Sequence, residues 1–296
     1  FIAKPNMTSI PNANSPSFAA LLYTFQGNII YISRKYGNDR YYKNVMEKVE
    51  RIEYGDSSSS FFVPPKSVEE KSEKLWILIG GNAALSLDWY DFCAAVQRTD
   101  PHYSFLLYEY DGYGFNTNTS PSPESIERSM QQLYDTFSND RKIPREINLL
   151  GHSLGSAAVL RFAAANNEKV NIKKTILISP FTSMLDMARV VLGPLPFIDT
   201  LLRHRWDNIE SVKMLQQDKA SIPKIFIMHG TRDGIIPFDQ GKKLYEAALS
   251  TGIDSVEFLP VKDANHNDII SRGFGDILDM MEQHDEDDSC AVDTDT

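Results

Sequence analysis

Residues 147–155 read Ile147-Asn148-Leu149-Leu150-Gly151-His152-Ser153-Leu154-Gly155, an apolar run that ends in the pattern Gly-x-Ser-x-Gly. The small residues that follow favour a helix. In this pattern the serine stands on a sharp turn between strand and helix, where its hydroxyl is exposed at the edge of a sheet. Two glycines let strand and helix pass closely because neither carries a Cβ. The stretch predicts Ser153 as a nucleophile; the alternative is an ordinary N-cap serine in a glycine-rich turn.

A serine hydroxyl needs a base to remove its proton, and His266 is the candidate. It lies in a loop just beyond the apolar run at residues 256–259, and in proteins with this motif the histidine comes last in chain order. The remaining histidines are expected to pack or to bond locally. The alternative for His266 is a solvated loop histidine.

The acid that orients the base is predicted to be Asp233. It is the only carboxylate in the turn at residues 229–234, which follows the apolar run at residues 225–228. Its carboxylate would accept the second ring N–H of His266 and stabilise the imidazolium that forms. The alternative is a turn aspartate that bonds its own backbone. Asp207 is the rival acid, but it opens a helix capping box that explains it structurally.

The oxyanion of a tetrahedral intermediate needs two backbone N–H donors. One comes from the residue after the nucleophile, Leu154, and the other from a loop after an earlier strand. Gly80-Gly81-Asn82-Ala83 follows the apolar run at residues 75–79 and fits that second position. The N–H of Asn82 is the predicted donor, with Ala83 one register position away. The alternative is a plain glycine turn.

Short apolar runs recur from residue 75 onward and suit strands that are buried on both faces. Helical patterns alternate with them; the clearest begins at Ser122-Pro123, a cap followed by an N1 proline. The alternation predicts an α/β fold with a doubly wound, mostly parallel sheet. Residues 28–33, 49–54 and 61–63 are expected to form antiparallel strands at its leading edge. The six later runs lie at residues 75–79, 104–108, 147–150, 175–178, 225–228 and 256–259.

Length and apolar content predict one domain over residues 1–283, because 296 residues with 42% hydrophobic content can fill one large core. Residues 180–222 are too long for an ordinary connection and are expected to form a small helical cap inserted into that domain. Residues 284–296 are acidic, lack an apolar period and are expected to form a disordered tail.

Charge and cysteine content limit the class of protein. The formal net charge is -10 with no Lys/Arg cluster, which argues against nucleic acid as a partner. Cys93 and Cys290 are too few for a disulfide framework, so a cytosolic or cytosol-facing location is favoured. The predicted chemistry requires neither a metal nor an organic cofactor.

These motifs resemble the α/β-hydrolase superfamily, and several are similar to its membrane-associated branch, which includes protein depalmitoylases and lysophospholipase-like enzymes. The resemblance covers about residues 21–281. Two positions depart from the branch: Gly80 stands where it commonly has histidine, and Glu109 where it usually has aspartate. Because the branch often carries an N-terminal anchor, membrane association through a segment upstream of Phe1 stays open. The matching stretches are Gly81-Asn82-Ala83, Tyr110-Asp111-Gly112-Tyr113-Gly114, Gly151 to Gly155, Pro180-Phe181-Thr182-Ser183, His229 to Asp233 with Pro237-Phe238, and His266-Asn267-Asp268.

The expected function is hydrolysis of a carboxylic ester or thioester through an acyl-enzyme on Ser153, with a small-molecule or acyl-protein substrate. Apolar residues between 181 and 202 are candidates for an acyl pocket, the alternative being that they form the core of the cap itself. A second hypothesis is a binding or scaffold protein that keeps the fold without turnover. Epoxide and haloalkane chemistry would want an aspartate in place of Ser153, and a peptidase of this superfamily would ordinarily bring a further domain.

Overall fold

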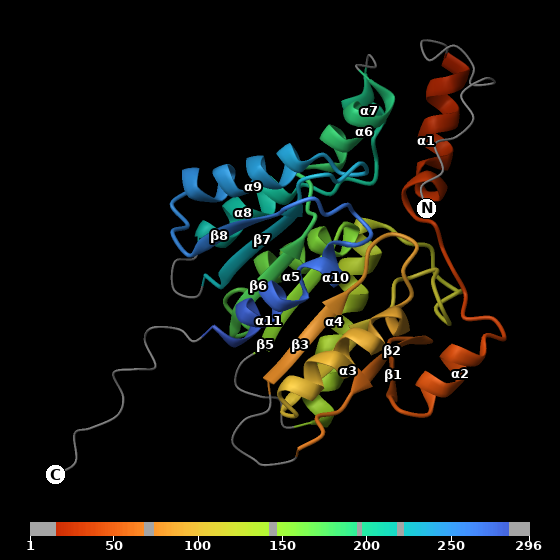
Figure 1. The fold of residues 1–296 in the computed structure, drawn as a ribbon. Coiled ribbons are helices and arrows are strands. Elements are labelled where there is room, and N and C mark those ends of the chain that lie inside the picture. The colour runs from red at the N-terminus through yellow and green to blue at the C-terminus, as the bar shows by residue number, and fades with distance from the viewer. Residues whose placement is uncertain (1–15, 68–73, 142–146, 194–196, 218–221, 284–296) are drawn as a thin grey trace.

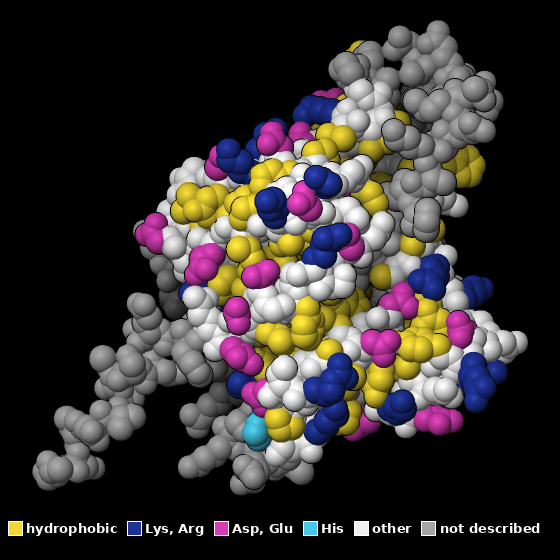
Figure 2. Space-filling model, in the orientation of Figure 1, with side chains coloured by type: hydrophobic (Ala, Val, Ile, Leu, Met, Phe, Trp, Pro, Cys, Tyr) yellow, Lys and Arg dark blue, Asp and Glu magenta, His cyan; other side chains and the backbone are white. Residues whose placement is uncertain are grey.

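The computed structural model of the chain describes residues 16–67, 74–141, 147–193, 197–217 and 222–283. Residues 284–296, where the acidic tail is predicted, lie outside the described residues. Among the helices of the described ranges, none has the length and apolar character needed to cross a bilayer. Figure 2 shows basic and acidic side chains interspersed with apolar ones over one face of the molecule.

An eight-stranded sheet forms the centre of the fold, in the order β1-β2-β4-β3-β5-β6-β7-β8. β2 pairs antiparallel with β1 and β4, and all later pairs are parallel, which confirms the predicted mostly parallel α/β sheet. Each of the six runs predicted after residue 75 is a strand. The strands are β1 (Glu50–Tyr54), β2 (Ser58–Val63), β3 (Lys74–Ile79), β4 (Tyr103–Tyr108), β5 (Ile147–His152), β6 (Ile172–Ile178), β7 (Lys224–Gly230) and β8 (Val256–Val261).

Helices cover both faces of this sheet (Figure 1). On one face α4, α5, α8 and α9 lie in a row, each packed against the next or against the strands beneath it. On the other face α3 and α11 meet through the rings of Phe92 and Phe274, whose centroids are 5.7 Å apart. These helices are α3 (Tyr90–Thr99), α4 (Pro123–Asp140), α5 (Leu154–Asn166), α8 (Asn208–Gln217), α9 (Phe238–Ser250) and α11 (Phe274–Glu282), with the short η2 (Ser86–Trp89) and α10 (Ile269–Arg272) beside them.

α4 begins as the sequence predicted. The hydroxyl of its N-cap, Ser122, accepts a hydrogen bond from the Ser125 backbone N–H at 3.0 Å, and Pro123 occupies the first helical position. Its apolar face, which includes Ile126 and Leu133, is buried. Capping and periodicity therefore suffice to place this helix.

The N-terminal segment differs from the prediction. Residues 28–33, expected as a strand, form the end of α1 (Pro16–Ile30) and an irregular segment that precedes α2 (Arg40–Met46). The Ile30 carbonyl and the Ile32 N–H are bonded to the amide of Asn82, 50 residues away, instead of to a neighbouring strand. A side chain thus takes the place of a sheet partner, which the residue pattern alone does not reveal.

In the described part of the segment predicted as a cap, three helices lie in two places. α6 (Met184–Leu192) and α7 (Ile198–Leu201) stand beside α1, at one end of the molecule (Figure 1). α8 instead packs against α5 and α9 as part of the layer that covers the sheet. A capping role for residues 180–222 stays a prediction.

Two glycines permit the close crossing of α5 over the sheet. A Cβ built on Gly155 would lie within 3.0 Å of the Ile79 and Gly80 carbonyl oxygens, and one built on Gly151 would lie as close to the Gly155 carbonyl. Those neighbours are backbone atoms of a buried sheet, which cannot yield as a flexible side chain would. Strand β5, the turn and α5 therefore fit together only with glycine at both positions.

We expect Gly155→Ala to lower the free energy of unfolding by about 3 kcal/mol, because the added methyl group forces apart two backbones in a packed core. Gly275→Ala is the matched control, since Gly275 is also helical and has no atom within 4 Å of its built Cβ. That control should gain up to about 1 kcal/mol from helix propensity. Urea unfolding of the three proteins measures both changes, and equal stability of Gly155→Ala and wild type would contradict the crossing.

Candidate active site

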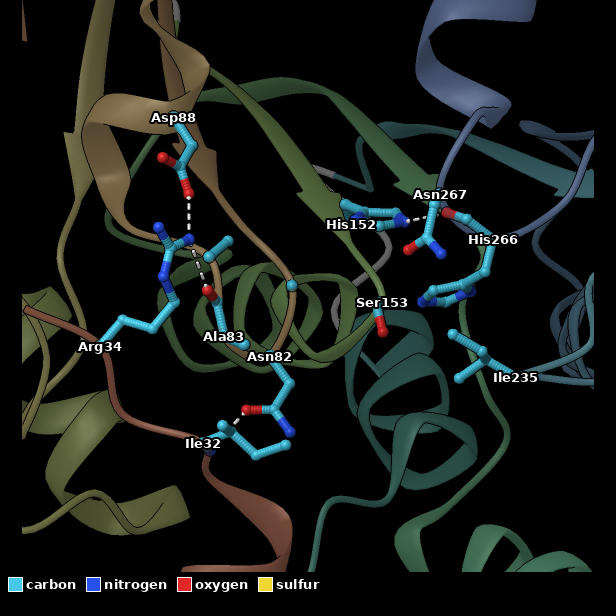
Figure 3. A pocket seen from close by; sticks show the side chains of 12 residues that line it. Ile32, Arg34, Asn82, Ala83, Asp88, His152, Ser153, Ile235, His266 and Asn267 are labelled. Carbon is cyan, nitrogen blue, oxygen red and sulfur yellow. Dashed lines mark hydrogen bonds and ion pairs between the residues drawn. The ribbon is translucent and has the colours of Figure 1, made fainter. Parts of the chain in front are cut away.

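Ser153 occupies the turn between β5 and α5 in a strained backbone conformation. Its φ of 56° and ψ of -118° are unusual for a residue with a side chain. Hydrogen bonds hold the turn: the Ser153 N–H donates to the Ile178 carbonyl at 2.8 Å, and the Ser156 hydroxyl to the Gly151 carbonyl at 2.8 Å. Such strain persists only where surrounding contacts fix it, and it is concentrated at functional sites. Ser153 lines the cavity shown in Figure 3.

His266 and Asp233 form a buried hydrogen-bonded pair. The distance from His266 Nδ1 to Asp233 Oδ2 is 2.7 Å, and both side chains are almost fully buried. The other carboxylate oxygen accepts the backbone N–H groups of Ile235 and Ile236 at 2.9 Å each. Burial acts to raise the pKa of Asp233, but these hydrogen bonds outweigh it and hold the pKa below its usual range. The acid is therefore charged and fixed in place, aligned with the Nδ1 side of the imidazole.

The opposite side of the His266 ring faces the nucleophile. In Figure 3 the ring lies beside Ser153, and both residues line the same cavity. The structure thus brings the three residues of the predicted triad together from the ends of β5, β7 and β8. Their catalytic roles stay a prediction.

Two further histidines lie near this pair and bond to backbone carbonyls, His229 within its own turn and His152 to a carbonyl 114 residues away in the sequence. His152 Nε2 lies 3.1 Å from the His266 carbonyl oxygen, and His229 Nε2 lies 3.0 Å from the Ile236 carbonyl oxygen. Burial lowers the pKa of His152 to about 3, with the nearby His266 adding to the effect, and burial also lowers the pKa of His229. Both rings are therefore neutral at pH 7 and hold the loops that carry His266 and Asp233.

The cavity has a volume of about 270 Å³ and mixed polarity. None of the described residues between 181 and 202, which the sequence suggested for an acyl pocket, lines it. Sequence reasoning also missed part of the wall, because Ile32 and Arg34 come from a segment that carries no motif. Among the side chains that line the cavity in Figure 3 are those of Ile32, Arg34, Asn82, Ser153, Ile235 and His266.

The predicted oxyanion donors lie on two sides of Ser153. Leu154 begins α5, and an N–H in the first turn of a helix has no partner within the helix. Asn82 and Ala83 both belong to the loop that forms the facing wall of the cavity. A Cβ built on Gly81 would lie 3.2 Å from Ser153 Cβ, so this loop passes in close contact with the nucleophile. The choice of the Asn82 N–H as donor stays a prediction.

Comparison with protein families matches two adjoining parts of the chain. Residues 75–198 match the family model described as alpha/beta hydrolase fold, and residues 200–283 match the model described as secretory lipase. The first match contains Asn82 and Ser153, and the second contains Asp233 and His266.

Curated relatives match a little more than half of the chain. It is 29% identical over 168 residues to the putative alpha/beta hydrolase L404 of Acanthamoeba polyphaga mimivirus. The matched region covers 56% of this chain and 57% of that protein. The chain is 28% identical over 167 residues to the alpha/beta hydrolase domain-containing protein 17C of Homo sapiens, covering 56% and 45%. The chain therefore spans about half the length of the curated relatives it matches.

The fold is also found in solved structures. An esterase of Pyrococcus furiosus superposes with a TM-score of 0.59 at 14% identity, over 83% of this chain and 92% of that chain. At this identity the likeness shows the shared fold alone.

Glu109, one of the two departures noted in the sequence, is a buried carboxylate at the end of β4. It accepts hydrogen bonds from the Tyr36 hydroxyl and, at 2.9 Å, from the Ser86 hydroxyl. Burial is the largest influence and raises the pKa of Glu109 to about 7, although these hydrogen bonds act to lower it. The group links the N-terminal segment, through Tyr36, to the loop that follows β3.

We expect the stability of the protein to depend on Glu109 between pH 4.5 and 8. The folded state holds this proton more tightly than the unfolded state, so the free energy of unfolding falls as pH rises from about 4.5 and levels off above about 7. At about 1.4 kcal/mol for each tenfold change in proton affinity, the loss is about 3 kcal/mol. Glu109→Gln should remove this part of the pH dependence in urea unfolding series at pH 5 and pH 8.

The control is Glu53→Gln, because the Glu53 side chain is 77% exposed. It should keep the pH dependence of the wild type. If Glu109→Gln kept it too, the raised pKa would be refuted.

Proposed function

We propose that this chain, an α/β-hydrolase-fold protein distantly homologous to the alpha/beta hydrolase domain-containing protein 17C and to viral putative hydrolases, cleaves carboxylic esters or thioesters. Esterases and a monoacylglycerol lipase are among the solved structures that share its fold, and part of the chain matches the secretory lipase model. The observation that carries the proposal is the 2.7 Å hydrogen bond from His266 to the buried Asp233, made beside a strained Ser153 in one cavity.

The proposed reaction begins with attack of Ser153 Oγ on the acyl carbon. His266 Nε2 takes the hydroxyl proton, and the charged Asp233 stabilises the imidazolium while holding the ring in orientation. The N–H groups of Leu154 and Asn82 donate to the oxyanion of the tetrahedral intermediate. His266 then returns the proton to the departing alcohol or thiol, which leaves an acyl-enzyme on Ser153.

Water completes the turnover. His266 removes a proton from the water molecule as it attacks the acyl carbon, and the second tetrahedral intermediate collapses to release the carboxylic acid and the Ser153 hydroxyl. The same groups therefore serve both half-reactions.

The cavity supports a compact substrate group at the point of attack. Its volume of about 270 Å³ lies near the lower end of the range for small-molecule sites. Ile32 and Ile235 give the cavity apolar surface, and Arg34 and Asp88 add a guanidinium and a carboxylate. A short acyl chain, or the first part of a longer one, fits these dimensions, and we therefore expect short-chain esters to serve as test substrates.

Labelling by a fluorophosphonate probe tests the nucleophile. We expect the folded wild-type protein to react with the probe and the variant Ser153→Ala to give no signal, because the probe forms a covalent bond with an activated serine. Ser156→Ala is a matched control, since that hydroxyl is buried in the same turn and is bonded to the Gly151 carbonyl. Equal labelling of wild type and Ser153→Ala would refute the assignment, and an unlabelled but folded wild type would favour a scaffold.

Replacement of the acid tests the negative charge that orients the base. Asp233→Asn keeps the shape but removes the charge that stabilises the imidazolium, and we expect kcat on p-nitrophenyl butyrate to fall by about 10³- to 10⁴-fold, as in the serine-protease template. Asp239→Asn is the control, because that carboxylate also follows β7 but lies on the surface, 71% exposed and 3.8 Å from the ammonium of Lys243. The control should stay within about twofold of wild type, and similar kcat values for both variants would contradict the role of Asp233.

A further inference from the structure

We propose that Asn82 is a positioning residue: its side chain fixes the oxyanion loop, residues 80–83, to the strap, which we define as residues 30–34 after α1. The strap then belongs to the catalytic apparatus, although it precedes the sheet in the chain. The inference rests on the proposed function, because it concerns the donor of the same site.

The Asn82 amide makes three hydrogen bonds. Its Oδ1 accepts the Ile32 backbone N–H at 2.8 Å and the Tyr113 hydroxyl at 2.8 Å, and its Nδ2 donates to the Ile30 carbonyl at 2.6 Å. Figure 3 shows the bond to Ile32 at the edge of the cavity. Both lone-pair sites of the amide oxygen are thereby used, so the side chain has a single arrangement in which all of these bonds are made.

Further bonds hold the rest of the loop. Arg34 Nη1 donates to the Ala83 carbonyl at 3.0 Å and lies 3.0 Å from Asp88 Oδ2, as Figure 3 shows. The Tyr110 hydroxyl donates to the Gly80 carbonyl at 2.8 Å. The loop is thus held at its first residue by the segment after β4 and at its last two residues by the strap.

The conformation of the loop shows why it needs such support. Ala83 has a φ of 64°, in the left-handed region that costs a residue with a Cβ about 1–2 kcal/mol. A strained turn of this kind relaxes unless its surroundings fix it. Because Gly81 passes within contact distance of Ser153, any relaxation changes the position of the Asn82 N–H relative to the nucleophile.

α1 and the strap are themselves anchored to the end of α7 and to the segment after it. The buried Gln26 donates to the Leu201 carbonyl at 3.1 Å and accepts the backbone N–H groups of Arg203 at 2.6 Å and His204 at 3.1 Å. The Tyr31 hydroxyl accepts the Trp206 indole N–H at 3.1 Å. Asn82, together with the bond from Arg34 to Ala83, therefore joins the oxyanion loop to a segment that is itself anchored.

Loss of the Asn82 amide should affect the transition state more than the bound substrate. The variant Asn82→Ala keeps its backbone N–H, but the loop that carries it is free to relax, and a misplacement of about 1 Å can cost about 10²-fold in rate. We expect kcat for p-nitrophenyl butyrate to fall about 10- to 100-fold while KM changes less than about threefold. Inhibition by phenylboronic acid, which forms a tetrahedral adduct with the serine, should weaken by a similar factor.

Gln97→Ala is the matched control for stability. Gln97 is a buried amide at the opposite end of the sheet, and its Nε2 donates to the Pro64 and Tyr103 carbonyls at 2.8 Å each. Its loss should lower the urea midpoint about as much as Asn82→Ala does and leave kcat and boronate inhibition at the wild-type values. Tyr113→Phe removes the hydroxyl that donates to the Asn82 oxygen and keeps the Asn82 side chain. It should shift kcat and boronate inhibition in the same direction, by about three- to tenfold.

The results separate the two proposals. If Asn82→Ala lowers the urea midpoint like Gln97→Ala but keeps wild-type kcat and boronate affinity, Asn82 is only structural and the positioning role is overturned. If Asn82→Ala does not fold, Tyr113→Phe decides by the same two readouts. Hydrolysis that survives Ser153→Ala would instead overturn the proposed function, and the positioning role with it.

Discussion

The rest of the structure depends on the backbone crossing of α5 with β3 and β5. Because Gly151 and Gly155 carry no Cβ, α5 approaches the backbone of the sheet closely, and Ser153 alone connects β5 to the helix. The positive φ of Ser153 belongs to this tight connection. The crossing therefore fixes the position of the hydroxyl, which lines the cavity directly before the start of α5.

Everything else in the site is placed by the parallel direction of the strands. The loop after β3, the turn after β7 and the loop after β8 all leave the same edge of the sheet, because these strands and the ones between them point the same way. Groups far apart in the sequence meet there without a long connection. This arrangement explains why Asn82, Asp233 and His266 can be assigned to one site from their positions after predicted strands.

Those parts of the fold and of the site that depend on a local residue pattern could be predicted from the sequence. The strands after residue 75 are apolar runs, α4 begins at its cap, and the triad candidates follow strand ends in a fixed order. The conformation of the strap and its place at the cavity could not be predicted from such patterns. Ile30 and Ile32 sit in a run of β-forming residues and were predicted as a strand, but their backbone groups bond to one amide 50 residues away. Hydrophobic periodicity indicates which face of a segment is buried, whereas this contact depends on a single polar side chain. For that reason Ile32 and Arg34 could not be assigned to the cavity from the sequence.

Burial and hydrogen bonding decide which groups of the site are charged. Three histidines surround one carboxylate, yet burial lowers the pKa of His152 and of His229 and keeps both neutral. His229 Nε2 is turned to the Ile236 carbonyl, and its distance of 3.5 Å from Asp233 is longer than the 2.7 Å that joins Asp233 to His266. The charge of Asp233, preserved by its hydrogen bonds, therefore acts chiefly on His266. The acid thus has its shortest contact with one imidazole of the three, and that imidazole is the one beside Ser153.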